Sequence, residues 1–588
     1  MRRSILFRLT ALTSAALLTL VGGYLFVRLT GVGGLTALDL ARTVLVVISG
    51  FWLIWGSAAA VLGVIAPRRI VTGDPTEPPR GMTAILVPIY NEDPLATFAR
   101  IAAMNRSLVA LGIAQRFHFA ILSDTQDMHN AAQEAAWFKR LVDEPMSDGR
   151  IFYRRRERNI GRKAGNIEDF ISHSGAAYDY ALILDADSLM EGATIGEMAR
   201  RMDADPKLGL FQTVPHIIHA RTPFGRSLQF SAAYLSPTFA RGAALMQGNE
   251  GPYWGHNAIV RVRAFAASCG LPELSGKPPF GGHILSHDYV EAALLSRAGW
   301  KVKMDPALPG SFEEGPENLI EYAKRDRRWC QGNLQHIRLL GAPGLKPWSR
   351  FTFVQGVMAY LASPLWLALL AASLAAAMFP DQPAVFAGEA ETSISSWTLV
   401  VAVGAVLILP KLLILLRGAF DGHNRRFGGT SRALASVLGE IVLSTLLAPT
   451  LLLLQSRAVA QVLLGIDGGW PATRRGQNWV GIADALRSSW WIVAVAALTL
   501  GGTLAYAPAN AVWVAPAMLP AIFAPLLISV TSRPSQWQRE PLLFATECEL
   551  TPSSVIVEQR AIMAAWSIHE PTLETSPVPM RAPRHVTA

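Results

Sequence analysis

The stretch YALILDADS, residues 180–188, joins an apolar run to two carboxylates. The run is short, uncharged and rich in bulky side chains, which is typical of a strand buried on both faces of a sheet. Asp185 and Asp187 follow with one residue between them, so alternation along an extended chain would place both side chains on one side. Neighbouring carboxylates repel each other unless a cation or a ligand lies between them. We therefore expect a buried strand that ends at an acidic binding site, although a plain acidic turn has the same sequence.

Four more apolar runs bounded by turn residues surround this stretch. They are TAILVPIY (83–90), FHFAILSD (117–124), IFYRR (151–155) and LGLFQT (208–213). Stretches with helical character lie between the first runs, for example 94–112 and 128–142. Alternation of strands and helices, with nearly continuous apolar strands, predicts an α/β domain with a parallel sheet covered by helices.

Polar side chains follow these strands directly. Ligands bind at the carboxyl ends of the strands in an open parallel sheet, so these side chains are candidates for a site. They are Asn91, Glu92, Asp93, Asp124, Arg154 to Arg158, Asp185 and Asp187. Mg²⁺ and Mn²⁺ are often held by only one or two carboxylates together with substrate phosphates. The mixture of acids and arginines fits a ligand of that kind.

The composition indicates a membrane protein with one large soluble region. The 588 residues are 51% hydrophobic and 16% charged, whereas soluble domains carry about 25% charged residues. Segments long enough to cross about 30 Å of hydrocarbon lie on both sides of the soluble region, at 9–27, 43–65, 351–379, 397–417, 433–464, 490–507 and 511–530. We expect two amino-terminal membrane helices in 1–65, a soluble domain with interfacial helices in 66–350, about five to six spans in 351–530, and a tail from 531 to 588.

Positive charge predicts the orientation. Basic residues flank the soluble region on both sides, in APRR (66–69) and KRDRR (324–328), so that region should be cytoplasmic. The loops 418–432 and 456–489 are also basic and should lie on the same side. The intervening segment 433–464 contains Glu440 and the break APT (448–450). It is therefore expected to cross twice or to be re-entrant. The tail should be cytoplasmic and partly disordered.

Several classes of protein are excluded or disfavoured. The three cysteines are far apart in the sequence, so neither a disulfide framework nor a metal-binding spacing is present. The net charge of +9 comes without a basic run interleaved with aromatic residues, so nucleic acid is not an expected partner. A G-x-x-x-x-G-K-[ST] loop is missing from the sequence, which argues against ATP-driven transport.

Six motifs in a fixed order resemble a known superfamily. They are ILVPIYNED (85–93), ILSDTQD (121–127), ERNIGRKAGNIEDF (157–170), LILDADS (182–188), SHDYVEAALLSRAGW (286–300) and KRDRRWCQGN (324–333). Together they resemble the processive family 2 glycosyltransferases, the superfamily of the cellulose and hyaluronan synthases. RRWCQGN followed by a long multi-span carboxyl half is most similar to the branch of glucosyltransferases that make osmoregulated periplasmic glucans.

The resemblance implies a fold and an activity. The fold would be an α/β GT-A glycosyltransferase domain inserted in a polytopic α-helical membrane domain of the bacterial inner membrane. The activity would be inverting, metal-dependent polymerisation of glucose from UDP-glucose into a β-1,2-linked glucan, with export through the enzyme's own channel. The cofactor would be Mg²⁺ or Mn²⁺. The partners would be the growing glucan and the lipid bilayer, and the resemblance also implies acyl carrier protein as a partner. Relatives tend to carry a longer amino-terminal extension, whereas here the first span starts almost at once.

The same resemblance gives roles to the residues at the strand ends. Glu92 and Asp124 would bind the uracil and ribose, Lys163 would lie near the phosphates, and Asp185 would hold the nucleotide side of the site. Asp187 would be the metal ligand. Gly161 and Gly165 would allow close approach of the backbone to phosphate. Ordinary turn acids and a solvated basic loop are the plainer readings of these residues.

A general base is expected in SHDYVEA (286–292). The family pattern there is Thr-Glu-Asp, and here it is Ser286, His287 and Asp288, so the aspartate is kept and the preceding acid is replaced. Asp288 would take the proton of the acceptor hydroxyl. It is also a good candidate for a helix N-cap. His287 either tunes Asp288 or is an ordinary residue of a helix start.

The acceptor site is expected in KRDRRWCQGN (324–333). The family pattern is Gln/Arg-x-x-Arg-Trp, so Arg325 and Arg328 would bind the diphosphate and Trp329 would stack on the acceptor sugar. A basic flank with an interfacial tryptophan is the plainer alternative. By resemblance, Arg474 and Arg475 would belong to a loop that covers the nucleotide.

Two other functions stay open on the sequence alone. One is a different family 2 transferase of the inner membrane, which makes another polysaccharide or loads a single sugar onto a polyprenyl phosphate. The other is a transporter or receptor with a cytoplasmic nucleotide-binding domain.

Overall fold

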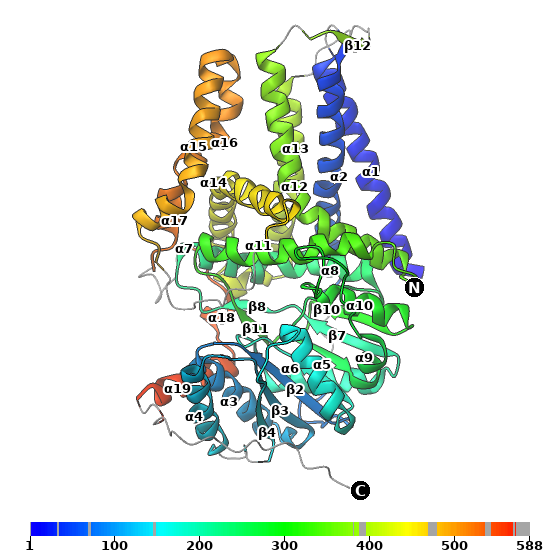
Figure 1. Ribbon diagram of the computed structural model, residues 1–588, viewed down its shortest axis with the longest axis vertical. Coiled ribbons are helices and arrows are strands. Elements are labelled where there is room, and N and C mark those ends of the chain that lie inside the picture. Colours follow the sequence, from blue (N-terminus) through cyan, green and yellow to red (C-terminus); the bar gives the residue numbers. More distant parts are fainter. Residues whose placement is uncertain are drawn as a thin grey trace.

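The computed structural model describes residues 2–31, 34–68, 72–144, 147, 149–379, 382–386, 395–467, 479–534, 543–568 and 571. These residues form a sheet domain and a group of long apolar helices. Figure 1 shows α1, α2, α12, α13, α15 and α16 standing together at one end, with the sheet at the other and α8 and α11 lying across between them.

The sheet domain is built on seven strands in the order β10-β7-β9-β5-β2-β3-β4. Their bounds are β2 Thr83–Ile89, β3 Phe117–Ser123, β4 Ile151–Arg155, β5 Tyr180–Ile183, β7 Leu208–Thr213, β9 Ala258–Arg261 and β10 Lys301–Asp305. A smaller sheet joins β6 Leu189–Met190, β11 Ser311–Glu314 and β8 His216–Ile218. All five strands predicted from apolar runs are confirmed.

The prediction of an all-parallel sheet is wrong at one strand. β9 lies between β5 and β7 and pairs antiparallel with both, while the other strand pairs of the large sheet are parallel. The strand AIVR is short and follows a stretch with several glycines and turn residues. That context favours a loop, so the run of three apolar residues was missed.

Alternate side chains of β2 build two cores on opposite faces of the sheet. Ile85 and Val87 belong to one core, and Ala84 and Leu86 belong to the other. The helices that complete these cores and surround the site are α3 Pro94–Ala110, α4 Met128–Val142, α5 Arg162–Ser174, α6 Gly192–Ala204, α9 Val262–Ser268 and α10 His287–Arg297. Three helices lie toward the membrane helices, namely α7 Pro223–Phe230, α8 Ser236–Gln247 and α11 Leu319–Gln335.

Six helices in the described part of the chain are long and apolar enough to cross a membrane, or seven if a bent pair forms one span. They are α1 Arg2–Thr30, α2 Ala37–Ile65, α12 Pro347–Met378, α13 Ser396–Phe420, α14 Thr430–Leu463 and α15 Ile482–Tyr506. The bent pair is α16 Ala511–Ile522 with α17 Ala524–Thr531, and the two parts meet at 52°. Far from the sheet domain (Figure 1), β1 Leu35–Thr36 pairs with β12 Ala384–Phe386.

Segment 433–464 lies in one helix, α14, with Pro449 inside it. Both ends of α14 contact helices next to the sheet domain. Near its start, Ala433 packs in one cluster with Phe230 of α7. Near its end, Gln461 accepts a hydrogen bond of 2.9 Å from Arg327 of α11. A return of the chain to the side it came from is compatible with these contacts, and the number of crossings stays a prediction.

The tail is more ordered than its composition suggests. Residues 543–568 include α18 Glu547–Leu550 and α19 Ser554–Ile568, and α19 lies beside α3 and α4 (Figure 1). Trp566 stacks on Trp137 at 5.5 Å between ring centroids. This part of the tail therefore belongs to the core of the sheet domain.

The membrane helices are joined to the sheet domain by a contact between two backbones. A Cβ at Gly63 of α2 would lie 1.8 Å from the carbonyl oxygen of Thr238, and a Cβ at Gly242 of α8 would lie 1.7 Å from that of Ala59. Only glycine fits at either position, because both distances are far below any real carbon–oxygen contact.

We expect Gly242→Ala to destabilise the protein, because the added methyl group forces α2 and α8 apart. Overpacking of this kind costs about 1–3 kcal/mol, so the thermal unfolding midpoint in detergent should fall by several degrees. Gly404→Ala in α13 is the matched control, since a Cβ there meets nothing within 4 Å. Equal midpoints for the two variants would contradict the contact.

Candidate active site

One cavity of about 2260 Å³ brings together nine of the residues predicted for the site, whereas Asn91, Arg154 to Arg158 and Gly165 are not in its lining. Its lining contains Glu92, Asp124, Lys163, Asp185, Asp187, Asp288, Arg325, Arg328 and Trp329. These residues span more than two hundred positions of the sequence, and the roles assigned to them one by one stay predictions.

The strand order explains where the cavity lies. From β2 the chain continues to β3 and β4 on one side, and returns to β5 on the other side of β2. The ends of β2 and β5 therefore form a switch point, where open α/β sheets bind ligands. Glu92 follows β2, Asp124 follows β3, and Asp185 follows β5.

Asp185 and Asp187 lie in a turn, so the expectation of an extended chain is wrong here. β5 ends at Ile183. The backbone N–H of Ser188 donates to the carbonyl of Asp185 at 3.1 Å, and the N–H of Asp185 donates to the Ser188 hydroxyl at 2.9 Å. The turn, rather than strand alternation, leaves both carboxylates at the cavity.

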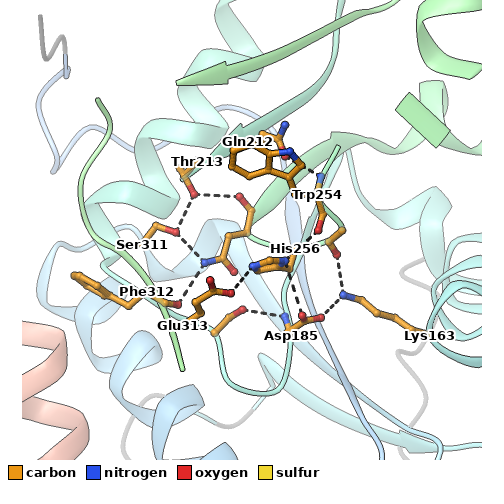
Figure 2. A network of polar contacts seen from close by, with 12 residues as sticks. Lys163, Asp185, Gln212, Thr213, Trp254, His256, Ser311, Phe312 and Glu313 are labelled. Carbon is orange, nitrogen blue, oxygen red and sulfur yellow. Dashed lines mark hydrogen bonds and ion pairs between the residues drawn. The ribbon is translucent and has the colours of Figure 1, made fainter. Parts of the chain in front are cut away.

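Asp185 is held between two cationic groups (Figure 2). Lys163 forms an ion pair with it and donates a second hydrogen bond to the Gly255 carbonyl at 2.8 Å. His256 lies on the other side, 3.9 Å from Asp185 and 2.8 Å from Glu313. Burial alone would raise the pKa of Asp185, but the charges of Lys163 and His256 hold that pKa well below its usual value.

The surroundings of His256 favour the protonated form of its imidazole. Burial lowers its pKa, yet Glu313 and Asp185 outweigh burial and raise it to about 9. Charge therefore alternates from Lys163 through Asp185 and His256 to Glu313. The pKa of Glu313 is correspondingly lowered, since His256 and Arg325 outweigh the effect of burial.

The loop that carries His256 is fixed by the strands around it. The backbone N–H of Trp254 donates to Gln212 of β7 at 3.1 Å, and the Asn257 amide donates to Ser311 of β11 at 2.8 Å. Asn257 itself has a φ of +49°, in the left-handed region. Figure 2 shows how these contacts close around the loop, so the position of His256 is set by backbone and buried side chains.

Sequence reasoning missed His256 and Glu313. The nearby aromatic residue Tyr253 is 1% exposed and gives no surface signal of a site. Neither residue belongs to a recognisable spacing. His256 follows a glycine turn and Glu313 lies in a short strand. Their connection with the site is visible only in the fold, where His256 lies between Asp185 and Glu313.

The glycines of NIGRKAGN close a turn rather than only leaving room for phosphate. Gly161 has a φ of +66° and precedes α5. A Cβ at Gly165 would lie 2.3 Å from the carbonyl oxygen of Ile160. The turn directs the amino end of α5, with Lys163, toward the cavity, where the helix dipole favours negative charge.

Asp124 is buried beside an arginine. Its side chain is 3% exposed and accepts a hydrogen bond of 2.7 Å from Nε of Arg156. Burial raises the pKa of Asp124 in spite of Arg156. Arg156, which follows β4, thus forms an ion pair with the carboxylate that follows the neighbouring strand β3.

Asp288 lies in the first turn of α10, and the N-cap position belongs to Ser286. The alternative that Asp288 is simply the N-cap is therefore wrong. Burial raises the pKa of Asp288 to about 6, with Glu291 adding to the rise and His287 opposing it. His287 lies 2.9 Å from Glu291, and its own pKa is raised because that carboxylate outweighs burial. His287 therefore has an electrostatic effect on Asp288.

The predicted acceptor motif lies on α11, with Trp329 at the cavity. The guanidinium of Arg325 stacks over the indole of Trp329 at 4.3 Å, and Trp329 is 41% exposed. The opposite side of the helix is fixed to the membrane part, where Gln331 donates to Asp467 at 2.8 Å. The cavity continues between membrane helices, whose lining residues include Trp55, Gln355, Tyr360 and Asp484. Arg474 and Arg475 lie outside the described residues.

The carboxylates fit a divalent cation only together with a phosphate ligand. In the described part of the chain, no three or more His, Cys, Asp or Glu side chains are grouped as a metal site. Asp185 and Asp187 nevertheless present oxygen donors to the cavity. One or two carboxylates with phosphate oxygens are the usual surroundings of Mg²⁺ and Mn²⁺.

Two family models match the chain. The model "Glycosyl transferase family 2" matches residues 84–268, and "Glycosyl transferase family group 2" matches residues 180–412. Both ranges contain the turn with Asp185 and Asp187, and together they cover the sheet domain and the first helices after it.

Curated relatives match over most of their length. The chain is 51% identical to the glucans biosynthesis glucosyltransferase H of Cereibacter sphaeroides, over 99% of this chain and 98% of that protein. The relatives of the same name in Vibrio cholerae and Bradyrhizobium diazoefficiens are 40% and 39% identical, over 90% and 96% of this chain and 75% and 77% of theirs. Among solved structures, a mannosyltransferase of Pyrobaculum calidifontis is 17% identical, with a TM-score of 0.42 over 69% of this chain and 98% of that one.

We expect Lys163→Gln to weaken binding of a nucleoside diphosphate, with UDP as the probe. The substitution keeps the side chain's reach but removes the charge beside Asp185, so a diphosphate would meet a carboxylate without its cation. Loss of a charge-assisted hydrogen bond corresponds to about a ten- to hundredfold weaker affinity, measurable by titration calorimetry. Lys277→Gln is the control, because Lys277 is exposed and outside the cavity. Unchanged UDP affinity in Lys163→Gln would contradict this reading of the network.

Proposed function

From the premise that the chain belongs to glycosyl transferase family 2, in the branch of the glucans biosynthesis glucosyltransferases H, we propose how it makes its product. The chain is a glucosyltransferase of glucan synthesis with a GT-A-like fold and the character of a membrane protein. Our proposal is that it polymerises glucose from UDP-glucose into a β-1,2-linked backbone and passes the growing chain between its own membrane helices.

One observation carries the proposal. A single cavity joins the Lys163–Asp185 pair, Asp288 and the exposed Trp329 to residues of α2, α12 and α15. A donor site alone would need no opening toward membrane helices. A cavity that runs from the nucleotide site into the membrane part supports synthesis coupled to export.

The donor would lie at the switch point of the sheet. Glu92 and Asp124 would bind the base and ribose, and Lys163, Arg325 and Arg328 would bind the diphosphate. Asp187, next to Asp185, would hold Mg²⁺ or Mn²⁺. When bound, that cation neutralises charge on the departing UDP.

Asp288 would act as the general base of an inverting transfer. The acceptor hydroxyl loses its proton to Asp288 as its oxygen bonds to the anomeric carbon of glucose. The bond between that carbon and the phosphate oxygen breaks, and the electron pair leaves with UDP. Trp329 would stack on the acceptor sugar, with Arg325 fixing the indole from its other face.

Localisation follows from the same arrangement. We place the catalytic domain in the cytoplasm, where UDP-glucose is made, and the helices in the inner membrane of a bacterium. Acyl carrier protein stays a partner implied only by resemblance.

Product analysis tests the proposal. Purified membranes containing the protein should convert UDP-glucose, and no other sugar in a panel of UDP-sugars, into chains of many residues with β-1,2 linkages. EDTA should stop the reaction, and Mg²⁺ or Mn²⁺ should restore it. A product of one sugar on a lipid phosphate would show that the chain is a non-processive transferase.

We expect transfer to depend on an ionised Asp288. Since protonated Asp288 cannot accept a proton and its pKa is about 6, the turnover rate should be level above that pH and fall about tenfold per unit below it. Asp288→Asn should lower turnover by about 10²–10⁴-fold at neutral pH with UDP affinity unchanged.

The control is Asp74→Asn, an exposed carboxylate that bonds to Thr76 outside the cavity. A parallel loss of UDP affinity and turnover in Asp288→Asn would make Asp288 a nucleotide-site residue instead of the base.

A further inference from the structure

The carboxyl-terminal segment 543–568 forms part of the cavity wall. Glu549, Gln559, Arg560 and Met563 all line the cavity together with the predicted site residues. The two family models end at residues 268 and 412. This wall is thus contributed by a part of the chain that neither model includes.

The segment is fixed at both ends. At its start, Glu549 of α18 forms an ion pair of 2.7 Å with Arg226 of α7, and Thr546 accepts from Gln229 at 3.2 Å. Along α19, Glu558 forms an ion pair of 2.6 Å with Arg106 of α3. The anchoring side chains hold α19 in place and leave Arg560 directed to the cavity.

A chain of printed contacts runs from Arg560 to the acidic turn. Nε of Arg560 donates to Nε2 of His219 at 3.4 Å, and Nδ1 of His219 lies 3.4 Å from Glu314. Arg100 then donates to Glu314 at 2.6 Å and, with its other nitrogen, to the carbonyl of Ala186 at 3.1 Å. Ala186 is the residue between Asp185 and Asp187, so the contacts end at the turn itself.

The donors and acceptors along this chain are consistent. Since Arg560 only donates, Nε2 of His219 must accept, which leaves the proton on Nδ1 to be donated to Glu314. His219 has a φ of +66°, a left-handed conformation that a histidine adopts only when its surroundings require it. Arg100 is 4% exposed, so its orientation is fixed by burial as well as by its two acceptors.

We propose that Arg560 is a positioning residue for the donor site, which acts through His219, Glu314 and Arg100 on the turn that carries Asp185 and Asp187. Gln559, beside Arg560 on α19, is also among the residues that line the cavity. Its side chain is 1% exposed, and its Oε1 has no hydrogen-bond partner among the described residues. The inference rests on the proposed function for the identity of the donor but not for the contacts.

The experiment compares Arg560→Ala with two matched variants in the full-length protein. Arg560→Lys keeps a donor for His219, and Val557→Ala changes a side chain on the same helix that is 51% exposed and outside the cavity. We expect Arg560→Ala to raise the KM for UDP-glucose about three- to tenfold, with the acceptor dependence unchanged. Arg560→Lys should recover most of the loss, and Val557→Ala should match the unaltered protein.

Hydrogen exchange gives a readout that does not depend on the substrate. Amides of residues 184–188 should exchange faster in Arg560→Ala than in Val557→Ala, while those of α19 stay protected. A double-mutant cycle of Arg560→Ala with Glu314→Gln should be non-additive, since both changes interrupt one chain of contacts.

Three results would overturn the proposal. They are additive effects in the cycle, equal exchange at 184–188 in Arg560→Ala and Val557→Ala, or faster exchange confined to α19, which would make Arg560 a local anchor of the helix. If the unaltered protein does not use UDP-glucose, the proposed function fails, while the exchange data still decide the role of Arg560.

Discussion

The pairing of Asp185 with Lys163 on one side and His256 on the other is the interaction on which the site depends. These side chains come from the turn after β5, the start of α5 and the loop before β9. His256 is largely buried, and Lys163 and Asp185 are only partly exposed, so each charge would carry a desolvation cost if the others were absent. Their mutual neutralisation lets the fold keep an ionised acid and a lysine at the end of the sheet, where the proposed metal-bound diphosphate would need both signs of charge. Two local features bring these side chains together. The turn at Gly161 directs the start of α5 to the cavity, and hydrogen bonds to Gln212 and Ser311 hold the loop of residues 254–257.

The helix α11 connects this chemistry to the membrane part. Arg325 and Trp329 are on its cavity side, whereas Arg327 and Gln331 bond to α14 and to the residues just after it. One helix therefore carries residues of the cavity on one side and is bonded to the membrane part on the other. The basic cluster before a membrane helix is explained by this double attachment, since its arginines divide between the cavity and α14 instead of all facing the membrane surface.

The sequence predicted those features that repeat or stand at a strand end. Apolar runs located five strands, and their ends located Glu92, Asp124, Asp185 and Asp187 beside one cavity. Prediction from the sequence failed for residues whose role depends only on their neighbours in the folded chain. The short β9 follows glycines, and His256 and Glu313 stand alone in the sequence. For Asp185 and Asp187 the predicted location was right but the predicted reason was wrong. A turn closed by Ser188, and not alternation along a strand, brings both carboxylates to the cavity.

The contact of Gly63 and Gly242 limits how the enzyme can move. Where two backbones touch, no layer of side chains remains that could re-pack during sliding or tilting, so α2 and α8 behave as one rigid unit. The contact therefore opposes a hinge movement of α8, and with it of the sheet domain, against α2. Under the proposed function, the nucleotide site would then stay in place while the product itself moves by one sugar length at each addition.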